Sequence, residues 1–226
     1  MRMKSQSYSV GVGESAVEQL KPVYLNGPKR IIDVVFSLMI LPFLAPIIAI
    51  MYILVRLDGG PGFFGQERVG LNGNVFKCWK MRSMVVDAEK ALAEACACDA
   101  KVAEEWERMQ KLEDDPRITR IGKFIRETSL DELPQIWNVL RGDMSIIGPR
   151  PFMVDQESIY KEAGGGDGYF KLRPGISGLW QTEGRGTTSF VSRIQYDNHY
   201  YANVSFGMDL WILFRTVVVV LRRTGA

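Results

Sequence analysis

Few residues in this sequence belong to the types that form disulfide frameworks or histidine-rich metal sites. Its 226 residues include three cysteines, Cys78, Cys96 and Cys98, and one histidine, His199. Three thiols cannot all pair within one chain, and Cys96 and Cys98 lack the second pair of ligands that a zinc site needs. The sequence therefore indicates reduced thiols in a cytosol-facing protein, and we assign His199 to packing rather than to catalysis.

The sequence also lacks an excess of either charge. Lysine and arginine total 28 and aspartate and glutamate total 26, which gives a formal net charge of +2. Nucleic-acid-binding domains usually carry a basic surplus, so the bulk charge gives no reason to expect nucleic acid as a partner. Neither a Gly-x-x-x-x-Gly-Lys loop nor a strand-linked Gly-x-Gly-x-x-Gly occurs, so no P-loop or dinucleotide-binding fold is predicted.

Charged residues are missing altogether from Val34 to Val55. This run of about 22 residues is long enough to span a bilayer. Residues 1–27 are polar and aperiodic, which predicts a flexible tail. We therefore divide the chain into a tail (1–27), a membrane segment (28–57) and a folded domain (58–226) that is long enough to bury a core.

Two prolines, Pro42 and Pro46, lie in the middle of the apolar run. An interior proline removes a backbone hydrogen bond and bends or breaks a helix. Lys29 and Arg30 precede the run and Arg56 follows it, and basic flanks favour the cytoplasmic side of a membrane. The pattern fits a broken helix that enters and leaves by one leaflet, and it fits nearly as well a kinked helix that spans the membrane.

Apolar residues on both sides of Asn72-Gly73 predict a β-hairpin between residues 63 and 84. Strand alternation places Lys80 and Arg82 on one face of this hairpin, where the two cations would suit an anionic ligand. A solvated basic face is the alternative.

Between Ser129 and Gly142, apolar residues recur at helical spacing, which predicts a short helix with one apolar face. These residues are Leu133, Ile136, Trp137 and Leu140. Ser129, followed three residues later by Glu132, is typical of a capping box, and Gly142 is a typical stop. Asp131 and Glu132 would then lie in the first turn, at the positive end of the helix dipole.

This acid pair has two interpretations. In the first, the carboxylates are a cap that complements the dipole, and in the second, they are a nucleophile and a metal ligand at a phosphate-binding site. Arg150 follows in the chain between Pro149 and Pro151, which hold the backbone stiffly around a guanidinium suited to bidentate phosphate binding. Arg150 taken alone would be a surface turn residue, so only the combination favours the phosphate site.

Residues 86–114 are rich in alanine, glutamate and lysine and predict a long surface helix or a helical pair to which we assign no chemistry. Residues 115–126 predict another helix, with a proline near its start. The last residue of that helix, Arg126, is then close enough to Asp131 to share its site.

The C-terminal part of the sequence contains a glycine-rich loop and a short apolar segment. The loop carries Arg173 and Arg185 on a backbone that can approach a phosphate closely. Residues 210–221 are too short to span a bilayer and suit an interfacial helix at an anionic membrane. Helices interspersed with a hairpin predict an α+β, helix-rich fold.

Together these segments resemble the bacterial sugar transferase family, the monotopic phosphoglycosyl transferases, from Lys29 to about the C-terminus. Each motif is short, but the set in this order is highly specific. The motifs are Lys29-Arg30-x-x-Asp33 ahead of the proline-broken run, Lys80-x-Arg82-x-Met84, Ser129-Leu-Asp-Glu-Leu-Pro-Gln, Gly142-Asp-Met-Ser, Gly148-Pro-Arg-Pro, Arg173-Pro-Gly-Ile-Ser-Gly and Asp197-x-x-Tyr200-Tyr201.

The resemblance implies a re-entrant membrane helix broken at Pro46, interfacial amphipathic helices, and one catalytic domain (58–226) on the cytoplasmic face of the bacterial inner membrane. It implies transfer of a hexose 1-phosphate, galactose or glucose, from a UDP-sugar to undecaprenyl phosphate, with release of UMP. Asp131 would form a covalent phosphosugar intermediate and Glu132 would bind Mg²⁺. The other residues that we expect to bind substrate or phosphate are Arg126, Arg150, Arg185, Asp197, Lys80, Arg82 and Arg173.

Two departures from the family pattern affect this expectation. Ala45 stands where many members have serine before the proline, so one hydroxyl that could satisfy a freed carbonyl is missing. Gly186 stands where the loop often has asparagine, which puts contacts to the sugar or nucleotide in doubt.

The resemblance favours the short forms that prime exopolysaccharide repeat units. It leaves open whether the chain forms a homo-oligomer or contacts downstream glycosyltransferases. Two other functions remain as alternatives: a metal-dependent glycosyltransferase that releases UDP, and a non-catalytic membrane adaptor of a polysaccharide assembly complex.

Overall fold

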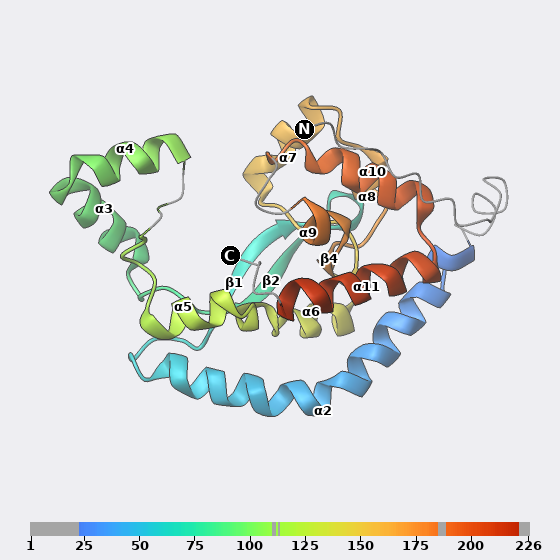
Figure 1. Cartoon of the computed structure of the whole chain (residues 1–226), viewed down its shortest axis with the longest axis horizontal. Helices are drawn as coiled ribbons and strands as arrows, with labels where there is room; N and C mark the ends of the chain where they lie inside the picture. The colour runs from blue at the N-terminus through green and yellow to red at the C-terminus, as the bar shows by residue number, and fades with distance from the viewer. Residues whose placement is uncertain (1–22, 110–111, 113, 185–188, 222–226) are drawn as a thin grey trace.

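One long apolar helix, α2 (Pro28–Arg56), lies along one side of the molecule, and the other elements pack above it in the view of Figure 1. The computed structural model describes residues 23–109, 112, 114–184 and 189–221. Within these ranges helices predominate and are accompanied by an antiparallel hairpin and a short parallel strand pair. The prediction of a helix-rich α+β fold is therefore confirmed.

Helix α2 is exposed along most of its length. An 18-residue window within it has a mean hydropathy of 2.6, and only 6% of that window is buried. The helix is thus long and apolar enough to cross a membrane, and it is not buried as the core helix of a soluble protein would be. It continues through Pro42 and Pro46 and bends along its course instead of breaking (Figure 1), as interior prolines allow.

Both ends of α2 are attached to the same folded domain. At its start, Lys29 Nζ lies 2.5 Å from Asp209 Oδ2, and Arg30 donates to the carbonyl of Val139 at 2.5 Å. At its end, Val55 joins a buried cluster with Met81 of the hairpin and Ile125 of the helix α5 (Arg120–Glu127). A straight spanning helix would separate its two ends by the thickness of the bilayer, whereas the two ends of α2 contact one domain.

The predicted hairpin is present. Strands β1 (Phe63–Val69) and β2 (Val75–Met81) pair in antiparallel register along their whole length. The turn η1 (Leu71–Gly73) contains Asn72 with φ of 58° and Gly73 with φ of 78°. Both values lie in the left-handed region, which asparagine and glycine adopt more readily than other residues.

Of the two forms predicted after the hairpin, one long helix or a helical pair, the pair is present, as α3 (Ala88–Cys98) and α4 (Ala100–Met109). The pair stands to one side of the molecule in Figure 1. Helix α5 (Arg120–Glu127) follows, and Thr119 caps it, because its Oγ1 accepts a hydrogen bond from the backbone N–H of Gly122 at 2.8 Å. This helix begins later than the sequence predicted.

The helix expected to start at Ser129 is divided into a short turn, η2 (Leu130–Glu132), and α6 (Gln135–Arg141). The capping-box prediction is wrong, because Ser129 has φ of 58° and its side chain makes no capping hydrogen bond. The predicted stop is confirmed, because Gly142 ends α6 with φ of 96°. The acid pair therefore lies on η2, ahead of α6, and is not supported by the dipole of a longer helix.

The strands β3 (Ser145–Ile147) and β4 (Gly175–Ser177) form the parallel pair. Its close packing requires glycine, because a Cβ on Gly148 would lie 2.3 Å from the backbone oxygen of Arg173. The remaining elements are η3 (Val154–Gln156), α7 (Glu157–Glu162), α8 (Asp167–Phe170), α9 (Leu179–Glu183), α10 (Arg193–Asn203) and α11 (Phe206–Leu221).

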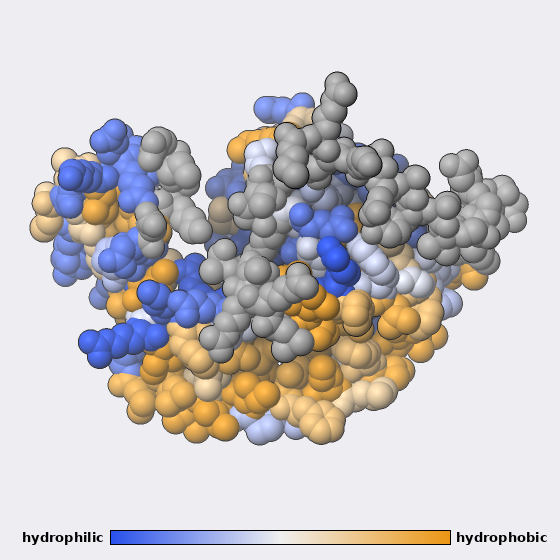
Figure 2. Space-filling view, in the orientation of Figure 1, coloured by the Kyte–Doolittle hydropathy of each residue, from blue (hydrophilic) through white to orange (hydrophobic). Residues whose placement is uncertain are grey.

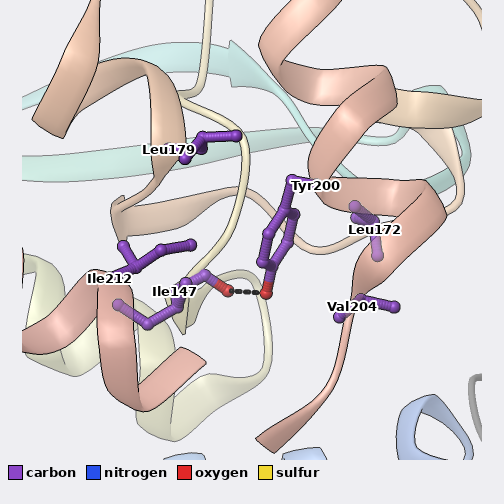
Figure 3. Packing of buried hydrophobic residues seen from close by; sticks show 6 residues of the cluster. All are labelled: Ile147, Leu172, Leu179, Tyr200, Val204 and Ile212. Atoms are coloured by element: carbon purple, nitrogen blue, oxygen red, sulfur yellow. Dashed lines mark hydrogen bonds between the residues drawn. The ribbon is translucent and has the colours of Figure 1, made fainter. Parts of the chain in front are cut away.

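The largest core cluster joins the parallel strands to the last two helices. Tyr200 of α10 is its buried ring, and the Tyr200 hydroxyl donates to the carbonyl of Ile147 at 3.3 Å (Figure 3). The same hydroxyl also donates to Asp209 Oδ1 at 2.5 Å. Lys29 at the start of α2 pairs with the same aspartate, so Asp209 links the core to the apolar helix. The buried members are Ile147, Leu172, Leu179, Tyr200, Val204 and Ile212.

An apolar surface covers the side of the molecule on which α2 lies (Figure 2). Helix α11 contributes to it with exposed side chains, while Ile212 on its other side is fully buried. The exposed apolar residues of α11 are Phe206, Leu210, Trp211, Phe214 and Val217. Helix α11 thus has the one-sided apolar exposure that suits an interfacial helix.

The folded part begins ahead of the predicted boundary at residue 28. Tyr24 and Leu25 pack against the largest core cluster, and the Tyr24 hydroxyl donates to Asp209 Oδ2 at 2.8 Å. The first part of the predicted tail, residues 1–22, lies outside the described residues.

Candidate functional site

The acid pair lies where the hairpin, η2 and the loop after β3 meet. Lys80 Nζ of β2 lies 2.8 Å from Glu132 Oε1 and 3.7 Å from Asp131 Oδ2. Arg150 Nη2 lies 2.8 Å from the same oxygen of Glu132. The sequence predicted all four of these residues as site residues, and the structure brings them together.

Burial and charge act in opposite directions on the pKa of Glu132. Burial acts to raise it, but the positive charges of Arg150 and Lys80 and their hydrogen bonds outweigh burial and hold the pKa well below its ordinary value. Glu132 is therefore ionised at any physiological pH.

The neighbouring carboxyl behaves differently. Burial raises the pKa of Asp131, and the charge of Glu132 adds to this effect, while Lys80, Arg126 and Arg150 act to lower it. Lys80 is the strongest of these opposing cations and also contacts both carboxylates. Two adjacent acids thus hold protons with different affinity, which is typical of carboxyl pairs with separate roles.

Arg150 is held in place by Arg193, a residue that the sequence did not single out. An Nη of Arg193 donates to the backbone carbonyl of Arg150, and its Nε lies 3.4 Å from Asp197 Oδ2. The Arg193 side chain is 3% exposed. Five aromatic rings surround its guanidinium at 5.3 to 5.9 Å, those of Phe152, Tyr160, Tyr169, Trp180 and Phe190.

Asp197 was predicted to line the substrate pocket, and the structure corrects this. Its side chain is 2% exposed and accepts hydrogen bonds from Arg193 and from the hydroxyl of Tyr160 at 2.9 Å. Burial raises the pKa of Asp197 to about 6, against the lowering effect of Arg193. Asp197 lies behind Arg150 and reaches the site only through Arg193. The spacing of Arg193 and Asp197, four residues apart on a helix, is the signal that could have identified this pair.

Arg82 does not join Lys80, contrary to the prediction. Its guanidinium pairs with Asp58 and donates to the carbonyls of Pro61 at 2.6 Å and Val55 at 3.0 Å. Strand β2 ends at Met81, so the alternation that would place Arg82 beside Lys80 no longer applies. Arg82 instead attaches the end of α2 to the domain.

Arg173 is also outside the acid-pair site. Its Nε donates to the carbonyl of Gly142 at 2.9 Å, and Arg173 lines a separate cavity of about 410 Å³ together with Lys29 and Arg30. Arg30 donates to another carbonyl at the end of α6, that of Leu140, at 2.9 Å. Two arginines thus satisfy the backbone carbonyls at this helix end. Capping of these orphan carbonyls accounts for both cations.

The other predicted residues fall into three cases. Arg126 is exposed at the end of α5, and its charge acts to lower the pKa of Asp131. Arg185 and Gly186 lie outside the described residues. Pro46 lies inside α2 and belongs to its bend, not to the charged site.

The acid pair fits a magnesium ion that a substrate would help to hold. Among the residues that the structure describes, no group of three or more His, Cys, Asp or Glu side chains could bind a metal alone. Mg²⁺ is commonly held by one or two carboxylates together with substrate phosphates and water. Lys80 and Arg150 both contact Oε1 of Glu132, so Oε2 lies outside these ion pairs.

Taken together, the site combines an ionised carboxylate, a second carboxylate beside it and flanking cations. Such cations attract a phosphate-bearing molecule and reduce the repulsion between its charge and a carboxylate. The arrangement can therefore support nucleophilic attack by a carboxylate on phosphorus.

The sequence is similar to a known protein family and to several known relatives. The model of the family described as bacterial sugar transferase matches residues 24–223. The chain is 48% identical over 198 residues to a "UDP-galactose-lipid carrier transferase" of Erwinia amylovora, covering 88% of this chain and 41% of that protein. It is 46% identical over 198 residues to an "Undecaprenyl-phosphate galactose phosphotransferase" of Salmonella typhimurium, with coverage of 88% and 41%.

A third relative has a similar length. The chain is 41% identical over 199 residues to the "Exopolysaccharide production protein ExoY" of Sinorhizobium fredii, covering 88% of this chain and 87% of that protein. The chain therefore spans less than half the length of the first two relatives and most of the third.

We expect Arg193→Lys to lower the free energy of unfolding by about 1.5–3 kcal/mol, the contribution of a hydrogen bond to a charged group. Lysine keeps the charge but loses the planar fork that contacts both Asp197 and the Arg150 carbonyl. Denaturation of the detergent-solubilised protein measures the change. Lys161→Met is the matched control, because Lys161 lies over Phe170 of the same aromatic cluster but is 57% exposed. Equal stability of Arg193→Lys and the wild type would contradict the role assigned to Arg193.

Proposed function

Because the chain belongs to the bacterial sugar transferase family, we propose that it transfers a hexose 1-phosphate from a UDP-sugar to undecaprenyl phosphate and releases UMP. The names of the Erwinia and Salmonella relatives refer to galactose, with a lipid carrier in the first and undecaprenyl phosphate in the second. The name of a Klebsiella pneumoniae relative refers to glucose 1-phosphate. Galactose and glucose are therefore the candidate sugars. The ExoY relative supports a first membrane step in exopolysaccharide assembly.

The observation that carries this proposal is the acid pair with its two cations. In the first step an oxygen of Asp131 attacks the sugar-linked phosphorus of the UDP-sugar. The bond between this phosphorus and the bridging oxygen breaks, and the electron pair leaves with UMP. Asp131 then carries the phosphosugar as an acyl phosphate.

In the second step a phosphate oxygen of undecaprenyl phosphate attacks the same phosphorus. The bond to Asp131 breaks, its carboxylate is regenerated, and the product is a polyprenyl diphosphate sugar. One anhydride is broken and another is made, so the overall reaction needs no separate energy source. A ping-pong order of substrates follows from this scheme.

The cations around the acid pair have a specific role in both steps. A carboxylate and a diphosphate repel each other, and Lys80 and Arg150 lie within ion-pair distance of the acid pair to reduce that repulsion. Lys80 also acts to lower the pKa of Asp131, which favours the ionised form that a nucleophile requires. Glu132 would hold Mg²⁺, which when bound supplies further charge stabilisation at the diphosphate.

We propose that α2 is a re-entrant helix whose two ends lie on the cytoplasmic face of the inner membrane. Its 29 residues would extend about 44 Å as a straight helix, more than the hydrocarbon thickness. Both ends nevertheless contact the same domain, as described above, and the bend at the prolines makes this compatible with a single leaflet. The apolar faces of α2 and α11 would then place the acid pair at the depth of lipid phosphates.

We expect Asp131→Asn to abolish both turnover and covalent labelling of the protein by radiolabelled UDP-sugar, because an amide cannot form the acyl phosphate. Labelling is measured on the purified protein in detergent without acceptor. Asp155→Asn, at an exposed acid of the turn η3, serves as control and should label as the wild type does. Persistent labelling of Asp131→Asn would rule out the covalent route.

Two further measurements test the alternative functions. Release of UDP instead of UMP by the wild type would favour a glycosyltransferase. Unchanged polymer in cells carrying Asp131→Asn would favour an adaptor.

Removal of divalent metal by EDTA should stop labelling, and added Mg²⁺ should restore it. For Glu132→Gln we expect a higher Mg²⁺ concentration at half-maximal labelling, because an amide is a weaker ligand than a carboxylate. Glu157→Gln, a partly buried acid on α7 that pairs with Lys161, is the control. Full labelling in EDTA would contradict a role for the metal.

Topology can be tested with single cysteines at the two ends of α2. Cys96 and Cys98 are replaced by serine, while Cys78 is 1% exposed and can remain. Asn26→Cys or Leu57→Cys is then introduced, and a membrane-impermeant maleimide is added to intact spheroplasts or to inverted vesicles. We expect both cysteines to react only in inverted vesicles. Reaction of the two ends from opposite faces would exclude a re-entrant helix.

A further inference from the structure

The separate cavity of about 410 Å³ is lined by the start of α2, the turn η1 and the segment before β4. It shares no described residue with the acid-pair site, which lies ahead of α6, whereas two arginines of the cavity contact the end of α6. Four basic residues and one acid line this cationic cavity: Lys29, Arg30, Lys171, Arg173 and Asp33. The residues around it therefore carry an excess of positive charge.

The one acid in the wall has partners within the protein. Asp33 Oδ2 accepts a hydrogen bond from the Ser145 hydroxyl at 2.7 Å, and Oδ1 accepts one from the backbone N–H of Ile146 at 3.0 Å. The residue is 4% exposed. Asp33 therefore serves mainly to attach α2 to strand β3.

The basic residues of the cavity differ in how their charge is balanced. Lys29 pairs with Asp209, and Lys171 Nζ lies 2.7 Å from Asp167 Oδ2. Within the described part of the chain, the two arginines form no ion pair and donate hydrogen bonds to backbone carbonyls. A carbonyl accepts a hydrogen bond but carries no net charge, so the charge of both guanidiniums is left unbalanced.

The two guanidiniums are attached to one short stretch of backbone. Arg30 Nη2 donates to the carbonyl of Leu140 and Arg173 Nε donates to that of Gly142, each at 2.9 Å. A Cβ on Gly142 would lie 3.6 Å from Arg30 Nη2. Two like charges on neighbouring carbonyls repel each other, and an anion placed between them in the cavity would turn this repulsion into attraction.

We infer that the cationic cavity binds a phosphate group, held by Arg30 and Arg173 with Lys171 beside them. Guanidiniums recognise phosphate through paired hydrogen bonds in addition to charge. The cavity volume of about 410 Å³ is at the lower end of the usual range for ligand sites, about 300–1,000 Å³. It suits a phosphate with a small substituent such as glycerol. The inference does not rest on the function proposed above.

A membrane phospholipid and free phosphate could both supply this group. The surroundings favour the lipid, because α2 begins at the cavity and exposes apolar side chains within its first turns, with Ile31 63% and Val35 50% exposed. Lipid phosphates lie just outside the hydrocarbon layer, so an α2 embedded in a bilayer would bring the cavity to their depth. A lipid bound there would fix the start of α2 in the headgroup layer.

Lipid binding to the full chain in an uncharged detergent tests the inference. Native mass spectrometry measures the Kd of phosphatidylglycerol and of phosphatidylcholine, and we expect the anionic lipid to bind more tightly. Inorganic phosphate is then added as a competitor. Displacement of phosphatidylglycerol by inorganic phosphate would identify free phosphate as a ligand of the cavity, whereas retention of the lipid would identify the headgroup. Equal Kd values for the two lipids would overturn the inference.

An added negative charge should weaken binding at this cavity. Asn72 lines the cavity and has φ of 58°, a conformation that aspartate also tolerates. We expect Asn72→Asp to raise the Kd of phosphatidylglycerol by about three- to fivefold, the effect of one partly exposed charge pair. Asn74→Asp is the matched control, because Asn74 is exposed at the end of the same turn and does not line the cavity.

Removal of a positive charge provides a second measurement with its own control. Lys171 is 55% exposed and pairs with Asp167 one turn earlier, and Lys161 is 57% exposed and pairs with Glu157 in the same way. We expect Lys171→Gln to raise the Kd of phosphatidylglycerol by about three- to fivefold, and Lys161→Gln to leave it unchanged. If neither Asn72→Asp nor Lys171→Gln differs from its control, the lipid binds elsewhere and the assignment of the cavity is wrong.

Discussion

The ion pairs of Glu132 with Lys80 and Arg150 connect three segments that are far apart in the sequence. One carboxylate oxygen joins strand β2, the turn η2 and the loop after β3. All three side chains are largely buried, and removing one partner of a buried ion pair typically costs about 3–5 kcal/mol because a charge is left unpaired. The geometry of the charged site and the packing of the domain therefore depend on the same contacts.

A second set of buried polar contacts determines where this site lies relative to the apolar surface. Asp209 accepts hydrogen bonds from Lys29 at the start of α2 and from Tyr200 in the core, while Arg82 attaches the other end of the helix. Polar anchors of this kind are directional, unlike apolar packing, and they fix α2 at both ends. The bend at the interior prolines is the deformation that lets one helix satisfy both anchors.

Features that depend on neighbouring residues were predictable from the sequence, and features that depend on distant partners were not. The Asn72-Gly73 turn and the Gly142 stop follow from local backbone preferences, and both are present. Arg82 was assigned to the substrate site by strand alternation and Asp197 by the family resemblance. Their contacts with Asp58, Tyr160 and the carbonyl of Val55 come from other segments of the chain and cannot be seen in a one-dimensional pattern. The left-handed Ser129 shows the same limit, because a capping-box pattern describes the residues but not the tertiary contacts that override it.

The opposite pKa directions of the two acids follow from this long-range geometry. Asp131 and Glu132 are adjacent in the chain, yet Glu132 contacts both cations closely, whereas Asp131 reaches Lys80 at 3.7 Å. Lys80 and Arg150 therefore stabilise the negative charge of Glu132 more than that of Asp131. Asp131 has fewer close ion pairs within the protein. A carboxylate that is held tightly by cations is suited to a binding role, and its less restrained neighbour is suited to nucleophilic attack. The two roles that we propose for these two carboxyl groups thus follow from where Lys80 and Arg150 lie.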